Sequence, residues 1–136
     1  MVAVTKPRVL IADDEPHVRV LLRAILKSMN CEVVGEAANG IETVELFKTL
    51  KPHLLLLDIN MPLKTGYEVL GEIFAQFPNA LVIMLTSVTD LESVEKCIEL
   101  GAANYIRKDT PTAELKSIIK ETFAEFVRSK SKPAGA

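Results

Sequence analysis

The sequence predicts an α/β fold in which a doubly wound, five-stranded parallel sheet is covered by five helices. Short apolar runs alternate along the chain with longer segments in which apolar residues recur at helical spacing. Three of the runs are apolar at successive positions, which is typical of strands that are buried on both faces. Strands that alternate with helices through short connections pair in parallel, with helices on both faces of the sheet.

The five short apolar runs are the expected strands. They lie at residues 9–12, 32–37, 53–58, 80–85 and 103–106. In a sheet of this class, ligands bind beyond the carboxyl ends of the strands, where the strand order reverses. The residues that follow these runs are therefore the first candidates for a functional site.

Five apolar stripes at helical spacing predict the helices that lie between and after these strands. The first stripe consists of Val18, Leu21, Leu22, Ile25, Leu26 and Met29. The other four stripes lie within residues 41–50, 70–77, 91–98 and 115–126. Each stripe would pack one side of its helix against the sheet.

Residues with known capping preferences mark several helix ends. Asn39 is expected to cap the second helix, and Thr89 with Glu92 forms a capping-box pattern at the start of the fourth. Gly101 is expected to end the fourth helix. Thr110-Pro111 is expected to cap the fifth helix and to supply its first-turn proline.

Length and composition predict one globular domain and exclude several classes of protein. The 136 residues, 49% hydrophobic and 25% charged, are expected to form one domain over residues 1–128, with a disordered tail at 129–136. A net charge of −2 gives no general attraction to nucleic acid, and no apolar run reaches the ~18 residues of a membrane span. The opening residues lack the apolar core of a secretory signal, so we expect a cytoplasmic protein.

Charged and hydroxyl side chains follow four of the five expected strands. Asp13 and Asp14 come directly after the first strand, and Asp58 ends the third. Thr86 follows the fourth strand, and Lys108 lies close to the end of the fifth. Because the carboxyl ends of parallel strands meet at one edge, we expect these side chains to gather there. Taken singly, the aspartate pair could merely open a helix, and the others could be turn or surface residues.

Gathered in one crevice, these groups predict phosphoryl chemistry. Three carboxylates raise each other's pKa unless a positive charge is bound among them. Mg²⁺ prefers oxygen ligands and keeps waters that phosphate oxygens can replace, so it is the expected cofactor. Lys108 would supply a charge and Thr86 a hydrogen-bond donor to one phosphoryl group, and Asp58 would be its nucleophilic acceptor.

Four segments carry a resemblance to a known family. They are DDE at 13–15, LLLLDINMP at 54–62 with Gly66, LTS at 85–87 and YIRK at 105–108. In this order they resemble the response-regulator receiver domain of two-component signalling, of the free-standing chemotaxis-regulator type, over about Arg8 to Val127. The resemblance implies a flavodoxin-like fold. It also implies a signalling switch that catalyses only its own phosphorylation and slow dephosphorylation, and not an enzyme.

The resemblance assigns the phosphorylation site. Asp58 matches the phosphoacceptor, which takes its phosphoryl group from a phosphohistidine on a histidine kinase or histidine phosphotransfer protein. Asp14, Asp58 and the backbone carbonyl of Asn60 match the direct Mg²⁺ ligands. Asp13 matches an acid that holds the ion through water.

The resemblance also implies a switch and an output surface. Lys108 and Thr86 match the residues that contact the phosphoryl oxygens. Tyr105 matches an aromatic residue that turns inward when Thr86 shifts. The implied output surface comprises the fourth helix, the fifth strand and the fifth helix, and it binds a protein target rather than nucleic acid or membrane. The implied oligomeric state is a monomer or weak dimer.

Four positions depart from the family pattern. Lys108-Asp109 stands where the family usually has Lys-Pro, often with a cis bond, so we expect a trans or reshaped loop. The LKT segment before Gly66 lacks the common acid, Ser87 replaces the commoner alanine, and Val88 is apolar where some relatives are polar. These departures concern the output surface and the phosphoryl lifetime rather than phosphorylation itself.

Three other functions are alternatives. A phosphatase of haloacid-dehalogenase type uses the same aspartate chemistry but needs a second aspartate two residues after the nucleophile, where this chain has Asn60. A flavin-binding module of similar topology is disfavoured by the acidic loop after the first strand, which would repel a phosphate. A receiver that no longer accepts phosphate is disfavoured because all five site residues are intact.

Overall fold

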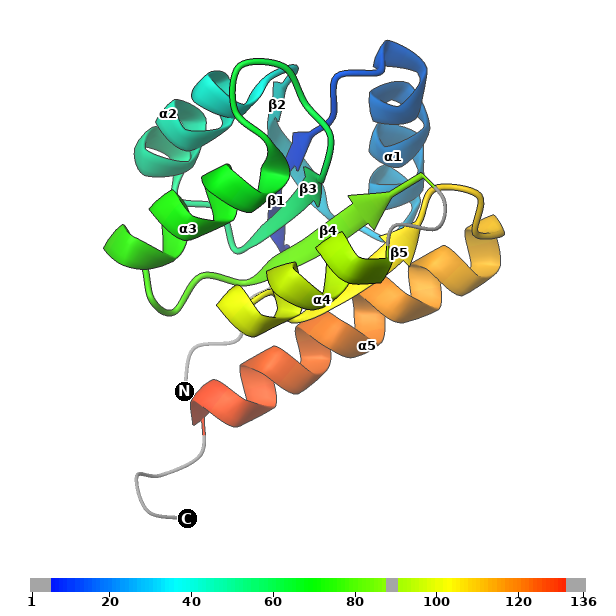
Figure 1. The fold of residues 1–136 in the computed structure, drawn as a ribbon. Helices are drawn as coiled ribbons and strands as arrows, with labels where there is room; N and C mark the ends of the chain where they lie inside the picture. Colours follow the sequence, from blue (N-terminus) through cyan, green and yellow to red (C-terminus); the bar gives the residue numbers. More distant parts are fainter. Residues whose placement is uncertain (1–5, 88–90, 132–136) are drawn as a thin grey trace.

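The computed structural model describes residues 6–87 and 91–131 and has the α/β fold expected from the sequence (Figure 1). The strands are β1 (Arg8–Ala12), β2 (Glu32–Ala37), β3 (Leu54–Asp58), β4 (Val82–Thr86) and β5 (Asn104–Arg107). The helices are α1 (Pro16–Ser28), α2 (Gly40–Leu50), α3 (Gly66–Gln76), α4 (Leu91–Leu100) and α5 (Thr112–Ser131). Each strand begins and ends within two residues of its expected position.

The sheet is parallel throughout, with strand order β2-β1-β3-β4-β5. The chain runs from β1 outward to β2 and then returns to the other side of β1 to form β3. The order therefore reverses between β1 and β3, which is where ligands bind in doubly wound sheets. The central strand β3 is buried along its whole length, and this explains its continuous apolar sequence.

Helices cover both faces of the sheet (Figure 1). One buried cluster joins α1 and α5 to one face, through residues such as Leu26 and Ile119. The other cluster joins α2, α3 and α4 to the opposite face, through residues such as Phe47, Ile73 and Val94. No helix among the residues that the structure describes is both long and apolar enough to cross a membrane.

The first apolar stripe is narrower than expected. Leu22, Ile25 and Leu26 are buried, but Leu21 is 50% exposed. Its assignment to the buried stripe is therefore wrong. The residue lies at the border of the stripe, and the partly buried Val18 and Met29 complete the stripe with the three buried residues. The neighbouring Val20 is also exposed, so α1 presents two apolar side chains to solvent.

The expected helix ends are partly confirmed. The Asn39 side chain accepts a hydrogen bond from the Glu42 N–H at 2.8 Å and caps α2. Gly101 follows α4 with a φ of +123°, a conformation that favours glycine. The expected capping box at Thr89 lies outside the described residues. A capping box that was not expected starts α3, where Thr65 and Glu68 exchange hydrogen bonds.

Helix α5 differs from expectation at both ends. It begins at Thr112, and the Pro111 carbonyl accepts the first helical hydrogen bond, from the Leu115 N–H at 2.9 Å. Pro111 therefore precedes the first turn instead of forming part of it. The helix continues to Ser131, so the tail expected from residue 129 is wrong for residues 129–131. Lys130 stabilises this last turn, because its ammonium donates to Asn79 Oδ1 at 2.9 Å and lies 5.3 Å from the Phe126 ring centre.

Candidate functional site

The carboxyl ends of β1 and β3 bring three carboxylates together. Ala12 pairs with Leu57 across the two strands, so Asp13 and Asp58, one residue further on, are neighbours. Asp13 is 0% exposed and Asp58 3%, whereas Asp14 is exposed. Ligand oxygens of the three side chains lie within 4.8 Å of one another. The structure thus assembles the acidic cluster expected from the sequence.

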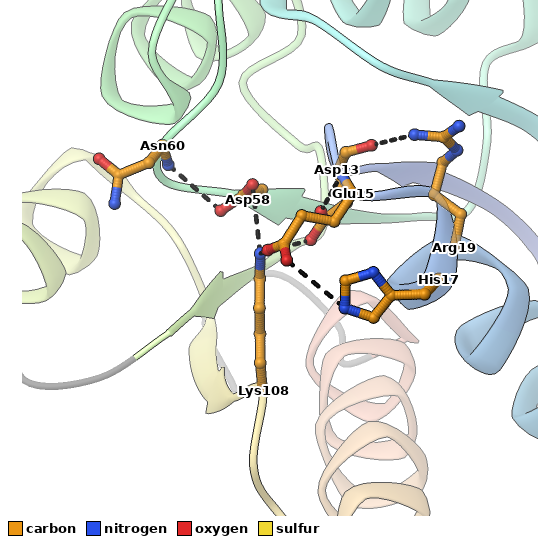
Figure 2. Close-up of polar contacts among 7 residues, drawn as sticks. All are labelled: Asp13, Glu15, His17, Arg19, Asp58, Asn60 and Lys108. Carbon is orange, nitrogen blue, oxygen red and sulfur yellow. Dashed lines mark hydrogen bonds and ion pairs between the residues drawn. The ribbon is translucent and has the colours of Figure 1, made fainter.

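Lys108 reaches this cluster from the loop after β5 (Figure 2). Its ammonium lies 2.8 Å from Asp13 Oδ2, 2.9 Å from Glu15 Oε1 and 3.3 Å from Asp58 Oδ2. Its backbone N–H donates to the Thr86 carbonyl at 2.8 Å, which anchors the loop to the end of β4. All peptide bonds between described residues are trans, including the one between Lys108 and Asp109.

Burial dominates the charge state of Asp58. It raises the pKa of this carboxyl to about 7, and the negative charge of Asp13 acts in the same direction. The Lys108 ammonium and the Asn60 N–H, which donates to Asp58 Oδ1 at 3.2 Å, oppose this rise. An additional positive charge at this point would favour the ionised form, which is the nucleophilic one.

The surrounding carboxylates favour the charged form of the Lys108 ammonium. Burial alone would lower the pKa of Lys108, but its close contacts with the Asp13 and Glu15 carboxylates and the charge of Asp58 raise it above its usual range. The hydrogen bond with Lys108 likewise holds the pKa of the Glu15 carboxyl below its usual range. The contact between Glu15 and Lys108 is therefore a pair of charges at neutral pH.

The turn after β1 is fixed from three sides. Asp13 Oδ1 accepts a hydrogen bond from the Glu15 N–H at 2.9 Å, and the Asp13 N–H donates to the Ala37 carbonyl at 3.0 Å. The Arg19 guanidinium donates to the Asp13 carbonyl at 2.6 Å (Figure 2). These bonds hold Asp13 in place although it is a buried carboxylate.

The loop after β3 folds back tightly over Asp58. The Gly66 N–H donates to the Ile59 carbonyl at 2.7 Å. A Cβ atom on Gly66 would lie 2.3 Å from the Asp58 carbonyl oxygen, which is closer than any side chain allows. Glycine at position 66 is therefore needed for the loop to pass this close to the strand end, and its small size was not part of the expectation from sequence.

The two expected switch residues lie in different surroundings. Thr86 ends β4 beside Asp58, because its preceding residue Leu85 pairs with Asp58 across β3 and β4, and it is buried. Tyr105 lies on the edge strand β5 and is 37% exposed. The structure thus brings Thr86 to the acidic cluster and leaves Tyr105 on the surface of the sheet edge.

The acidic cluster fits a hard divalent cation such as Mg²⁺. Oδ2 of Asp13 and Oδ2 of Asp58 are buried and accept no well-formed hydrogen bond from the residues that the structure describes. Their polar contact is the ion pair with Lys108. Buried carboxylate oxygens of this kind, with the exposed Asp14 beside them, form the all-oxygen donor set that Mg²⁺ prefers.

Two residues at this site were missed by the sequence reasoning. Glu15 pairs with Lys108, and Arg19 supports the turn that carries Asp13. Glu15 stands in the DDE segment, so its acidic neighbours were a signal for a role beside them. Arg19 lies one turn along α1 from that segment, and only its position on the helix could have indicated the contact.

Comparisons with known proteins agree with this geometry. Residues 9–120 match the family model of the response regulator receiver domain. The chain is similar to Protein CcdB of Bacillus subtilis, with 43% identity over 101 residues, or 74% of this chain and 84% of that protein. It is 40% identical to the chemotaxis protein CheY of Thermotoga maritima, with the same coverage of 74% and 84%. A crystal structure of a CheY-like receiver domain protein from Methanospirillum hungatei matches with a TM-score of 0.85 and 28% identity, over 92% of this chain and 99% of that one. The chain therefore belongs to the response-regulator receiver domain family.

Proposed function

We propose that this receiver domain accepts a phosphoryl group on Asp58 and thereby changes its affinity for a protein partner. Receiver domains are signalling switches of two-component systems, and phosphorylation and Mg²⁺ are general features of the family. The observation that carries the assignment to Asp58 is its position. It is a buried carboxylate at the end of the central strand, 3.3 Å from the Lys108 ammonium and within the three-carboxylate cluster.

The phosphoryl donor that this site suits is a phosphohistidine on a histidine kinase or histidine phosphotransfer protein. An Asp58 carboxylate oxygen forms a bond to phosphorus while the phosphorus–nitrogen bond breaks. The imidazole leaves with the bonding electron pair. Because such transfers have loose transition states, catalysis depends mainly on positioning and on neutralising the charge of the equatorial oxygens. Lys108 supplies charge to these oxygens, and the Thr86 hydroxyl supplies a hydrogen-bond donor.

The acidic residues are the proposed metal site. Asp14, Asp58 and the Asn60 carbonyl would hold Mg²⁺ directly, and Asp13 would hold it through water. The bound ion would supply positive charge that offsets the carboxylates and the incoming phosphoryl oxygens. The fixed turn after β1 and the close contact at Gly66 keep these ligands preorganised.

Phosphorylation and metal binding are tested together by mass spectrometry and calorimetry. With Mg²⁺ and acetyl phosphate, we expect the mass of the protein to rise by one phosphoryl group, and Asp58→Asn to abolish this rise. Asp109→Asn is a matched control, because Asp109 is an exposed acid beside Lys108 that pairs with Arg107. Asp14→Ala should weaken Mg²⁺ binding in calorimetry. A phosphorylated Asp58→Asn protein would mean that the acceptor is misassigned, and unchanged binding in Asp14→Ala would put the ion elsewhere.

The proposed output surface is the face formed by α4, β5 and α5. Leu91 and Ile98 of α4 and Tyr105 of β5 are exposed apolar side chains, which suit a protein partner. The acids on α4 and the net charge of −2 make nucleic acid an unsuitable one. Thr86 and Tyr105 lie on neighbouring strands, so a shift of Thr86 toward the phosphoryl group would alter this face.

Partner binding is tested by comparing beryllofluoride-treated protein with Asp58→Asn in pull-down experiments. A typical coupling free energy of ~1–3 kcal/mol would change affinity by roughly 5–150-fold. The exposed position of Leu91 allows Leu91→Ser to serve as a surface variant that should weaken capture without unfolding the protein. The same partners at the same occupancy in treated and Asp58→Asn samples would exclude the switch.

A further inference from the structure

Lys108 has a third acidic neighbour that belongs to neither the metal cluster nor the phosphoacceptor. Glu15 Oε1 lies 2.9 Å from the Lys108 ammonium and connects two positions that are 93 residues apart in the chain (Figure 2). Glu15 precedes the first turn of α1, but its side chain makes no capping hydrogen bond there. Its side chain is 43% exposed, whereas that of Lys108 is 12% exposed. Among the described residues, the polar contacts of this carboxylate are Lys108 and, at 3.5 Å, the His17 ring.

An ammonium group has only three N–H donors, and here three carboxylates surround it. Asp13 is fully buried, and its turn is held by hydrogen bonds to the main chain, so it stays beside the ammonium. Asp58 is the group that would carry the phosphoryl group and would bring its oxygens toward Lys108. Of the three carboxylates Glu15 is by far the most exposed, so it is the partner that a phosphoryl oxygen would displace. The displaced carboxylate keeps His17 and solvent as partners, because it is already partly exposed.

We propose that Glu15 is a positioning residue that holds Lys108 in the unphosphorylated domain and competes with the phosphoryl group for its ammonium. This inference rests on the proposed function, because it requires an anion on Asp58. Glu15 is suited to this competition because its carboxylate reaches the ammonium at 2.9 Å from the solvent-exposed side of the site. It thus sets how strongly the site retains a phosphoryl group without contacting that group itself.

The test is calorimetric titration with beryllofluoride, a phosphoryl analogue, at saturating Mg²⁺. Glu15→Gln keeps the shape of the side chain and removes its charge, so we expect roughly 2- to 5-fold tighter binding, the effect of losing one partly exposed ion pair. Glu15→Asp keeps the charge but is one methylene too short for the contact, so it should also bind more tightly than the wild type. Asp109→Asn removes a neighbouring charge that pairs with Arg107 instead of Lys108, and it should bind as the wild type does.

The outcomes separate the inference from the function on which it rests. Equal affinities for Glu15→Gln and Asp109→Asn, or weaker binding by Glu15→Gln, would overturn the competition. Tighter binding by Glu15→Gln with wild-type binding by Glu15→Asp would also overturn it, because simple charge repulsion would then explain the effect. Absence of wild-type binding, or binding by Asp58→Asn, would overturn the proposed function and the inference with it. Thermal unfolding of each variant verifies that the fold is retained.

Discussion

The two ends of the sheet treat their polar groups in opposite ways. At the amino end, the Arg8 N–H donates to His53 Nδ1 at 2.9 Å, and the Arg8 guanidinium donates to the carbonyls of Leu50 and Lys51 at the end of α2. These bonds satisfy groups that a helix end leaves without partners. At the carboxyl end, buried carboxylate oxygens lack well-formed hydrogen bonds and face one ammonium. The first arrangement favours stability, and the second keeps oxygens available for a ligand.

The two ends also differ in the kind of space that they enclose. The amino end contains a largely apolar cavity of about 560 Å³ between β3, the end of α1 and α5, lined by residues such as Met29, Leu54 and Phe123. The acidic cluster at the other end lies outside it. Cavity size therefore does not locate the chemistry of this fold. The clustering of buried carboxylates around one ammonium is the better guide, because perturbed charged groups gather where a site binds a ligand.

The largest expected effect comes from removing the single ammonium of the carboxyl end. Lys108→Met leaves two buried carboxylates facing each other, so the free energy of unfolding at pH 7 without Mg²⁺ should fall by about 3 kcal/mol. Urea unfolding measures this. Lys64→Met is the matched control, because Lys64 pairs with Glu72 near the surface and should lose less than about 1 kcal/mol. Equal losses in the two variants would contradict the contrast between the ends.

Replacing Asp58, whose pKa burial raises, should change the free energy of unfolding by less than Lys108→Met does, and in the stabilising direction. The pKa of Asp58 is raised to about 7 in the folded domain, whereas an unfolded aspartate has its usual value near 4. The folded state therefore loses stability as the pH rises from about 4 to 7, and the full loss persists above pH 7. Asp58→Asn removes this loss, so we expect it to be more stable than the wild type by about 1–3 kcal/mol at pH 8 and equally stable near pH 4.

This comparison requires chelator and urea unfolding at both pH values. Mg²⁺ should then stabilise the wild type at pH 8 more than it stabilises Asp58→Asn. Asp109→Asn, an exposed change of the same kind, should leave stability nearly constant across the range. A wild type that is as stable as Asp58→Asn at pH 8 without metal would contradict the pKa shift.

The smallest expected change in the free energy of unfolding comes from the titration of His53 at the amino end of the sheet. Burial lowers the pKa of His53, and the charge of Arg8 lowers it further. The neutral ring leaves Nδ1 free to accept the Arg8 N–H. The folded domain therefore loses stability as the pH falls through the unfolded value of about 6.5. We expect a loss below about 1 kcal/mol between pH 7.5 and 5.5, since the residue is partly exposed. The loss should be measured in the Asp58→Asn background, where the opposing titration of Asp58 is absent, and should disappear on adding His53→Asn.

The fold was largely predictable from the sequence because each strand is a short apolar run and each helix carries an apolar stripe at helical spacing. The gathering of the candidate site residues was predictable because parallel topology brings Asp13, Asp58 and Lys108 to one sheet edge. The contact between Glu15 and Lys108 was not predictable, since it depends on the conformation of two loops that are distant in sequence. Asn60 and Tyr105 keep roles that only the family resemblance suggests.

The errors at the helices have a common physical origin. Leu21 fits the periodic pattern but lies at the border of the buried stripe of α1, where its side chain is half exposed. Ser129 to Ser131 have no apolar period, yet the helix continues because the Lys130 ammonium donates a hydrogen bond to Asn79 and lies over the Phe126 ring. In both cases tertiary contacts, which a local pattern does not contain, decide the outcome.

The separation of 93 residues between Glu15 and Lys108 has a consequence for synthesis of the chain. The three aspartates leave the ribosome with β1 and β3, well before the segment that carries their counter-charge. A nascent chain that has completed four strands thus holds an acidic cluster with no ammonium, and its repulsion disfavours early closure of that edge. The arrival of β5 relieves the repulsion as Lys108 docks. We therefore expect a chain that ends before β5 to be destabilised for two reasons, the missing strand and the unbalanced charge of the cluster.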